Sequence, residues 1–190
     1  MAHYAKTWLT KEEWERLSGH RPIDLRDLLI IYVLYGCALR VSELCHLRVR
    51  DINLKERTIV LQKSKYRNKP LKKPLPKATA FWLKFYFDKA KPKKSNYLIY
   101  SHKGRGVKPI CRETIAMSLW KLGVAAGIGK KVTPHTLRRS RATHLLDAGL
   151  PIEQVSRLLG HREIRSTMEY LDLTTGQLAA KLKKVDPLAR

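Results

Sequence analysis

The chain has 190 residues, of which 39 are Lys or Arg and 16 are Asp or Glu, so its formal net charge is +23. This length fits one domain with a sizeable core, and a hydrophobic fraction of 44% excludes a disordered chain. So large a positive charge favours nucleic acid as the partner, ahead of an anionic membrane surface or a basic surface that serves only solubility or thermal stability.

The hydrophobic pattern predicts a mainly helical α+β domain with a small three-stranded antiparallel sheet. Residues 50–62 predict two short strands around a turn, and residues 63–73 predict a very basic hairpin tip that leads into a third strand. Gly36 is expected to end the most apolar helix. The expected helices span residues 10–17, 23–36, 39–49, 78–90, 112–127, 132–147, 151–160 and 174–184.

Cysteine usage and hydropathy indicate the compartment. Cys37, Cys45 and Cys111 show no paired spacing, which argues against a zinc site and fits a reducing, intracellular environment. The N-terminus does not read as a signal peptide. The longest apolar stretch, residues 28–39, is too short to span a bilayer.

The first candidate for chemistry is Arg40, which precedes Glu43 by three residues and begins a new helix. A helix N-terminus favours anions, so an arginine there can help to bind a phosphate. Taken alone, the pair is better interpreted as a surface ion pair that contributes roughly a few tenths of a kcal/mol.

The second candidate is a histidine and an arginine at another helix start. On a helical wheel, His135 and Arg138 share the face that should be buried with Ala142, Leu145 and Leu146. A buried guanidinium needs a partner. A phosphate would be held there by the helix end, the ring N–H and the guanidinium, while an internal carboxylate such as that of Glu43 is the competing partner.

The third candidate lies in residues 158–170. Gly160 is expected to end a helix, so that His161 lies just beyond the cap, and Tyr170 follows nine residues later. A tyrosine at the edge of the core is the common alternative for Tyr170.

Together, and in this order, these pieces resemble the tyrosine recombinase family, also called the phage integrase family. Its catalytic domain carries an arginine three residues before a Glu-Leu pair, a lysine on a β-hairpin, H-x-x-R, a histidine in L-G-H, and a nucleophilic tyrosine nine residues further on. This chain reads GCALRVSEL, QKSKYRNK, HTLRRS, LLGH and MEY. The resemblance extends from about Leu9 to about Leu182.

The resemblance implies a role for each matched residue. Arg40 and Arg138 clamp the non-bridging oxygens of the scissile DNA phosphate and stabilise the charge of the transition state. Tyr170 attacks phosphorus, and His135 is its base. His161 donates a hydrogen bond to the phosphate.

A hairpin lysine is expected to protonate the departing 5′-oxygen, and Glu43 is expected to support Arg40 or His135 from behind. Lys65 matches the family's lysine best. Its rivals are Lys63 and Lys69, on a tip that offers Lys63, Lys65, Lys69, Lys72 and Lys73. The residues expected to bind DNA are Lys63, Lys65, Arg67, Lys69 and Arg139.

The activity implied is that of a site-specific recombinase that breaks and rejoins DNA through a 3′-phosphotyrosine, for integration, excision or inversion. No metal or other cofactor is implied. The implied partners are double-stranded DNA and further copies of the chain, as a tetramer on paired sites, with no membrane and a cytoplasmic, nucleoid-associated location. The alternatives are a type IB topoisomerase and a catalytically idle DNA-binding accessory protein.

Residues 1–9 are expected to form an N-terminal arm and residues 10–190 the catalytic domain, with residues 173–190 as a C-terminal helix or tail that can be exchanged between protomers. Most members of the resembling family precede this domain with a helical DNA-clamping domain, for which residues 1–9 leave no room. The chain is therefore expected either to be similar to the small fimbrial-switch invertases, which lack that domain, or to be an isolated part of a longer protein.

Overall fold

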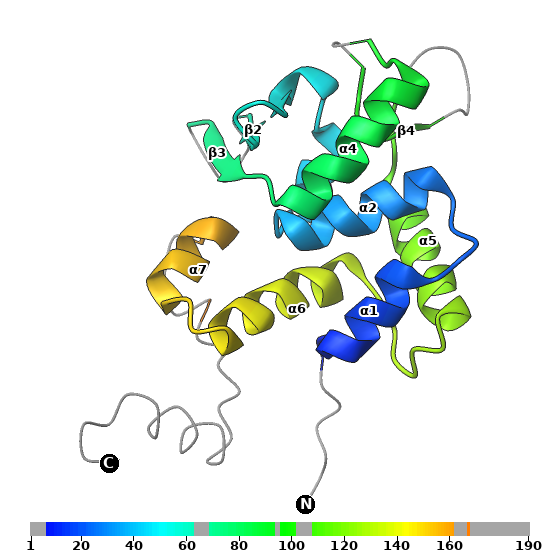
Figure 1. Ribbon diagram of the computed structural model, residues 1–190, viewed down its shortest axis with the longest axis vertical. Helices are drawn as coiled ribbons and strands as arrows, with labels where there is room; N and C mark the ends of the chain where they lie inside the picture. Colours follow the sequence, from blue (N-terminus) through cyan, green and yellow to red (C-terminus); the bar gives the residue numbers. More distant parts are fainter. Residues whose placement is uncertain (1–6, 63–68, 94–95, 102–107, 162–166, 168–190) are drawn as a thin grey trace, which may run out of the picture.

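The computed structural model describes residues 7–62, 69–93, 96–101, 108–161 and 167 (Figure 1). The helices are α1 (Lys11–Gly19), α2 (Leu25–Gly36), α3 (Val41–His46), the 3₁₀ turn η1 (Val49–Asp51), α4 (Lys77–Ala90), α5 (Arg112–Ala125), α6 (Pro134–Asp147) and α7 (Ile152–Leu159). The strands are β1 (Ile52–Asn53), β2 (Thr58–Leu61), β3 (Leu71–Pro74), β4 (Tyr100–Ser101) and β5 (Lys108–Pro109).

Helix α2 lies at the centre of the fold, because it is apolar on nearly every side. It packs against α4 on one side and against α1, α5 and α6 on the other (Figure 1). Its buried residues are Leu28, Leu29, Ile30, Ile31, Val33, Leu34, Tyr35 and Gly36. Among the described helices, none is long and apolar enough to cross a membrane.

The predicted three-stranded antiparallel sheet is confirmed, with the strand order β1-β2-β3. Ile59 of β2 pairs with Lys73 of β3, and Leu61 pairs with Leu71. Ile59 and Leu61 point into the core. A second, two-stranded sheet of β4 and β5 is also present, and it was not predicted from the sequence.

The ends of α1 and α2 show how two predicted boundaries are built. Helix α1 begins with a capping box: the Thr10 hydroxyl accepts from the Glu13 amide and the Glu13 carboxylate accepts from the Thr10 amide. Gly36 does end α2, but its small size serves packing: a Cβ there would lie 2.2 Å from Oγ1 of Thr79 on α4. The left-handed residue after α2 is instead Ala38, with φ of 48°.

Helix α6 buries most of the predicted face, and His135 is the exception. Arg138, Ala142 and Leu146 are buried as expected. His135 was expected on the same face, but it is exposed. His135 lies in the first turn of α6. The side chain that is buried in this turn is that of Thr136.

His144, a residue without a role in the sequence motifs, is buried on α6 and helps to hold the N-terminal segment. Its Nε2–H donates to the carbonyl of Leu9 (2.8 Å), and its Nδ1 bonds the Tyr35 hydroxyl (2.8 Å). The Leu9 amide donates to Oγ of Ser140 (2.8 Å). Residues 7–9, the end of the expected arm, therefore pack against α6.

Candidate active site

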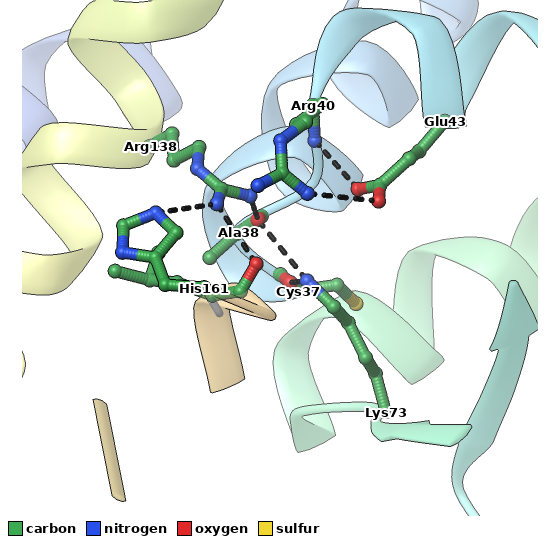
Figure 2. Close-up of polar contacts among 8 residues, drawn as sticks. Cys37, Ala38, Arg40, Glu43, Lys73, Arg138 and His161 are labelled. Atoms are coloured by element: carbon green, nitrogen blue, oxygen red, sulfur yellow. Dashed lines mark hydrogen bonds and ion pairs between the residues drawn. The ribbon is translucent and has the colours of Figure 1, made fainter. Parts of the chain in front are cut away.

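Arg138 is the centre of a cluster of polar groups that α2, α3, α6, α7 and β3 bring together (Figure 2). Its side chain is buried, and one guanidinium nitrogen donates to the carbonyl of Ala38 (2.6 Å). The other terminal nitrogen donates to the carbonyl of Leu159 (2.8 Å) and to Nε2 of His161 (3.1 Å). These three bonds fix the plane of the guanidinium.

Arg40 lies at the N-cap of α3 and is paired with Glu43. The Glu43 carboxylate accepts from the Arg40 amide at 2.8 Å and forms an ion pair with the Arg40 guanidinium at 3.5 Å. The Arg40 side chain remains 40% exposed, whereas that of Glu43 is 10% exposed. Glu43 thus holds Arg40 from the protein side, while the guanidinium remains open to a ligand.

Lys73 is a member of this cluster, although its place in the sequence puts it among the lysines of the basic tip. Its side chain is buried, and Nζ donates to the carbonyls of Cys37 (3.2 Å) and Ala38 (3.3 Å) (Figure 2). The signal was present in the sequence, because Leu71, Lys73 and Leu75 alternate with period two and so share one face of the strand.

His161 follows Gly160, whose φ of 68° ends α7 in the left-handed conformation. Because a guanidinium can only donate, Nε2 of His161 accepts from Arg138, and the proton lies on Nδ1, which donates to Oγ1 of Thr167 (2.8 Å). Burial lowers the pKa of His161 to about 4, and the charges of Arg138, Arg40 and Lys73 act in the same direction. The ring is therefore neutral at pH 7 in the DNA-free protein.

This arrangement predicts that His161 stays neutral on acidification well past the ordinary histidine range. In a ¹⁵N NMR titration of the DNA-free protein, His161 should keep the Nδ1–H tautomer down to about pH 5, because its folded-state pKa lies far below the usual value of roughly 6.5. The same chain in urea is the control. A midpoint at or above the ordinary value in the folded protein would show that the ring is not held against Arg138.

The balance of charge in the cluster favours an anion. The cations Arg40, Lys73 and Arg138 all act on the carboxylate of Glu43 (Figure 2). Although burial acts to raise the pKa of Glu43, the charges of Lys73, Arg40 and Arg138 and the Arg40 amide lower it on balance. The ionised carboxylate therefore leaves an excess of positive charge around the exposed Arg40 guanidinium, which suits a phosphate.

Of the remaining predicted residues, the structure describes His135, Lys69 and Arg139. His135 is exposed at the start of the helix that carries Arg138, and Lys69 is exposed where the chain enters β3. Arg139 donates to Oγ1 of Thr7 (2.8 Å). The residues outside the described part of the chain are Lys63, Lys65, Arg67 and Tyr170.

The sequence model of the phage integrase family matches residues 7–177, and the chain belongs to this family. It is similar to tyrosine recombinase XerA of Thermococcus kodakarensis, with 37% identity over 177 residues that cover 93% of this chain and 61% of that protein. It is also similar to tyrosine recombinase XerD of Listeria innocua, with 34% identity, covering 88% of this chain and 57% of that protein. The chain thus spans less than two thirds of the length of these curated relatives.

Solved structures show the same fold. The crystal structure of XerA recombinase superposes with a TM-score of 0.86 at 29% identity, covering 98% of this chain and 66% of that one. The Tn1549 transposon integrase, solved in complex with transposon right end DNA, superposes with a TM-score of 0.76 at 18% identity, covering 96% and 67%. The expected fold, a mainly helical recombinase domain with a small antiparallel sheet, is confirmed.

Proposed function

We propose that this chain is the catalytic domain of a site-specific recombinase that breaks and rejoins double-stranded DNA through a 3′-phosphotyrosine. The observation that carries the proposal is the fixed guanidinium of Arg138 beside the open guanidinium of Arg40, in a cluster where cations outnumber carboxylates. Groups held in place before the substrate binds stabilise transition-state charge at little reorganisation cost. The similarity to the XerA and XerD recombinases supports the same activity.

In the first transesterification, the Tyr170 oxygen attacks phosphorus and the bond from phosphorus to the 5′-oxygen breaks. His135 accepts the phenol proton, and a hairpin lysine, Lys65, gives a proton to the departing 5′-oxygen. Arg40 and Arg138 bind the two non-bridging oxygens. A 5′-hydroxyl then attacks the phosphotyrosine in the reverse sense, so that bond energy is conserved and no nucleotide is consumed.

His161 gains its expected role only when the phosphate binds. In the DNA-free arrangement its Nε2 accepts from Arg138 and has no proton to donate. A phosphodiester placed between Arg40 and Arg138 opposes the charges that lower the pKa of His161, and so favours a proton on Nε2. Binding of the substrate thereby turns the ring from an acceptor into a donor.

The partners and boundaries of the domain form part of the proposal. The net charge of +23 supports binding to the DNA backbone. We take the catalytic domain as residues 10–190 after an arm of residues 1–9, with residues 173–190 exchanged between protomers of a tetramer on paired sites. Such an enzyme works in the cytoplasm at the nucleoid.

Trapping of covalent adducts tests the proposed activity even though the DNA site is unidentified. The full chain is incubated in EDTA with a library of nicked suicide duplexes whose arms are randomised, and DNA attached to protein is recovered after denaturation and sequenced. Cleavage next to the nick releases a short fragment, so religation is blocked and the 3′-phosphotyrosine accumulates. We expect adducts with a common sequence.

A plasmid carrying two copies of the recovered site then separates the alternatives. Recombination of the two sites supports the recombinase. Relaxation without exchange would indicate a type IB topoisomerase, and binding without any adduct would indicate an accessory DNA-binding protein. A strict need for Mg²⁺ in the cleavage step would indicate a metal-dependent nuclease.

The proposed role of Lys65 has its own test. Lys65→Ala should cleave an ordinary phosphodiester slowly, because the 5′-alkoxide leaves without a proton. A 5′-bridging phosphorothiolate should restore most of the rate, since sulfur leaves as a thiolate. Lys63→Ala and Lys69→Ala are the matched variants, and rescue of either one in place of Lys65→Ala would move the role to that residue.

A further inference from the structure

Lys73 occupies a place in the sheet that normally belongs to an apolar side chain. It pairs with Ile59 across the ladder, and its side chain points to the same buried face. The next residue back, Lys72, points to solvent and forms an exposed ion pair with Glu56 (2.8 Å). Burying an ammonium costs free energy that an apolar residue would not cost, so the position calls for an explanation.

Lys73 and Arg138 share a hydrogen-bond acceptor. The Ala38 carbonyl accepts from both Lys73 (3.3 Å) and Arg138 (2.6 Å), and the Cys37 carbonyl accepts from Lys73 (3.2 Å) (Figure 2). Ala38 has a φ of 48°, which is unfavourable for a residue with a Cβ and persists only where the surroundings hold it. Lys73 and Arg138 are two of the groups that hold it.

We propose that Lys73 is a positioning residue for DNA cleavage: its buried ammonium holds the carbonyls of Cys37 and Ala38 and, through Ala38, keeps the guanidinium of Arg138 in the orientation that binds the scissile phosphate. The proposal deepens the recombinase function proposed above and depends on it. Lys73 acts through Arg138 and stays covered, in contrast to the hairpin lysine that protonates the leaving oxygen.

The positive charge of Lys73 is central to this role. Hydrogen bonds from an ammonium are roughly twice as strong as those from a neutral donor. Burial lowers the pKa of Lys73 to about 8, although the Glu43 carboxylate acts to raise it. The ionisable and charged groups around the ammonium are Cys37, Arg40, Glu43, Arg138 and His161.

Three variants test the proposal, with the recovered suicide duplex as the substrate. Lys73→Met removes the charge and the donors at similar volume, and Lys73→Gln keeps N–H donors but removes the charge. Lys72→Met is the matched control on the same strand. We expect single-turnover cleavage on the order of ten- to a hundredfold slower for Lys73→Met and an intermediate loss for Lys73→Gln, with DNA binding near that of the wild type. Lys72→Met should cleave at the wild-type rate.

Two readouts separate positioning from a merely structural role, and a third separates it from proton donation to the leaving group. The ratio of wild-type to Lys73→Met cleavage rates should be largest below pH 8 and should fall above it, because the wild type then loses the same ammonium. The cleavage loss of Lys73→Met should persist at temperatures well below its thermal midpoint, where the variant is fully folded. A 5′-bridging phosphorothiolate should leave Lys73→Met slow, because no proton to the leaving group is involved.

The outcomes are distinct. If the wild type forms no adduct, the recombinase proposal itself fails. If the wild type cleaves and Lys73→Met cleaves equally well, the positioning role is refuted. Rescue of Lys73→Met by the phosphorothiolate would make Lys73 the proton donor and also overturn it. Should both variants fail to fold, Lys73→Leu takes their place, because an apolar side chain suits this inward ladder position, and cleavage by it at the wild-type rate would refute the role.

Discussion

Tyr170→Phe is expected to abolish the covalent protein–DNA adduct completely while leaving the fold and DNA binding unchanged. The substitution removes one oxygen atom, which is the nucleophile in the proposed reaction, so the 3′-phosphotyrosine cannot form at this position. The measurement is adduct formation on the suicide duplex, resolved on a denaturing gel, with binding measured in parallel by gel shift.

Tyr66→Phe is the matched control, because Tyr66 lies in the basic segment between β2 and β3 and is the next tyrosine to consider. It should form adducts at the wild-type level. Adducts of Tyr170→Phe at the wild-type level would refute Tyr170 as the nucleophile, and loss of adducts in Tyr66→Phe would transfer the assignment to Tyr66.

Arg138→Lys is expected to slow cleavage by on the order of a hundredfold or more, although the charge is kept. The guanidinium of Arg138 donates in fixed directions to the carbonyls of Ala38 and Leu159 and to His161. An ammonium is a point charge on a flexible stem and cannot satisfy these acceptors and a phosphate in one plane. Single-turnover cleavage gives the rate, and thermal unfolding gives the accompanying loss of stability.

Arg40→Lys should lose a comparable factor in cleavage but little stability, because the Arg40 side chain is 40% exposed and only its guanidinium pairing with Glu43 is lost. Arg26→Lys is the control, and it should cleave at nearly the wild-type rate, since Arg26 pairs with Asp27 at the start of α2 and is not one of the site residues. Losses of only a few-fold in both Arg40→Lys and Arg138→Lys would mean that the two arginines are structural.

Much of the site could be predicted from the sequence because its signals are local. Spacing along one helix is enough to place Arg138 on the buried face of α6. The three-residue spacing from Arg40 to Glu43 is enough for the Glu43 carboxylate to accept from the Arg40 amide at the start of α3. Gly160 has the left-handed φ that a helix stop requires, which places His161 at the end of α7. The order of these motifs along the chain led to the family before any tertiary contact was known.

What only the tertiary structure decided is the set of partners that are far apart in the sequence. The carbonyl of Ala38 binds Arg138, 100 positions away, and Lys73, 35 positions away, and main-chain acceptors carry no signature in the sequence. The helical wheel placed His135 on the buried face of α6, but the first buried residue of this helix is Thr136, and His135 is exposed. The period-two alternation with Leu71 and Leu75 could place Lys73 on the inward face of its strand, but its partners, the carbonyls of Cys37 and Ala38, depend on how the sheet packs against the end of α2. By itself, the sequence determined the motifs, their order and the helices that carry them. Packing decided which charged side chains are buried and which carbonyl groups they bond, because burial and long-range pairing depend on the whole fold.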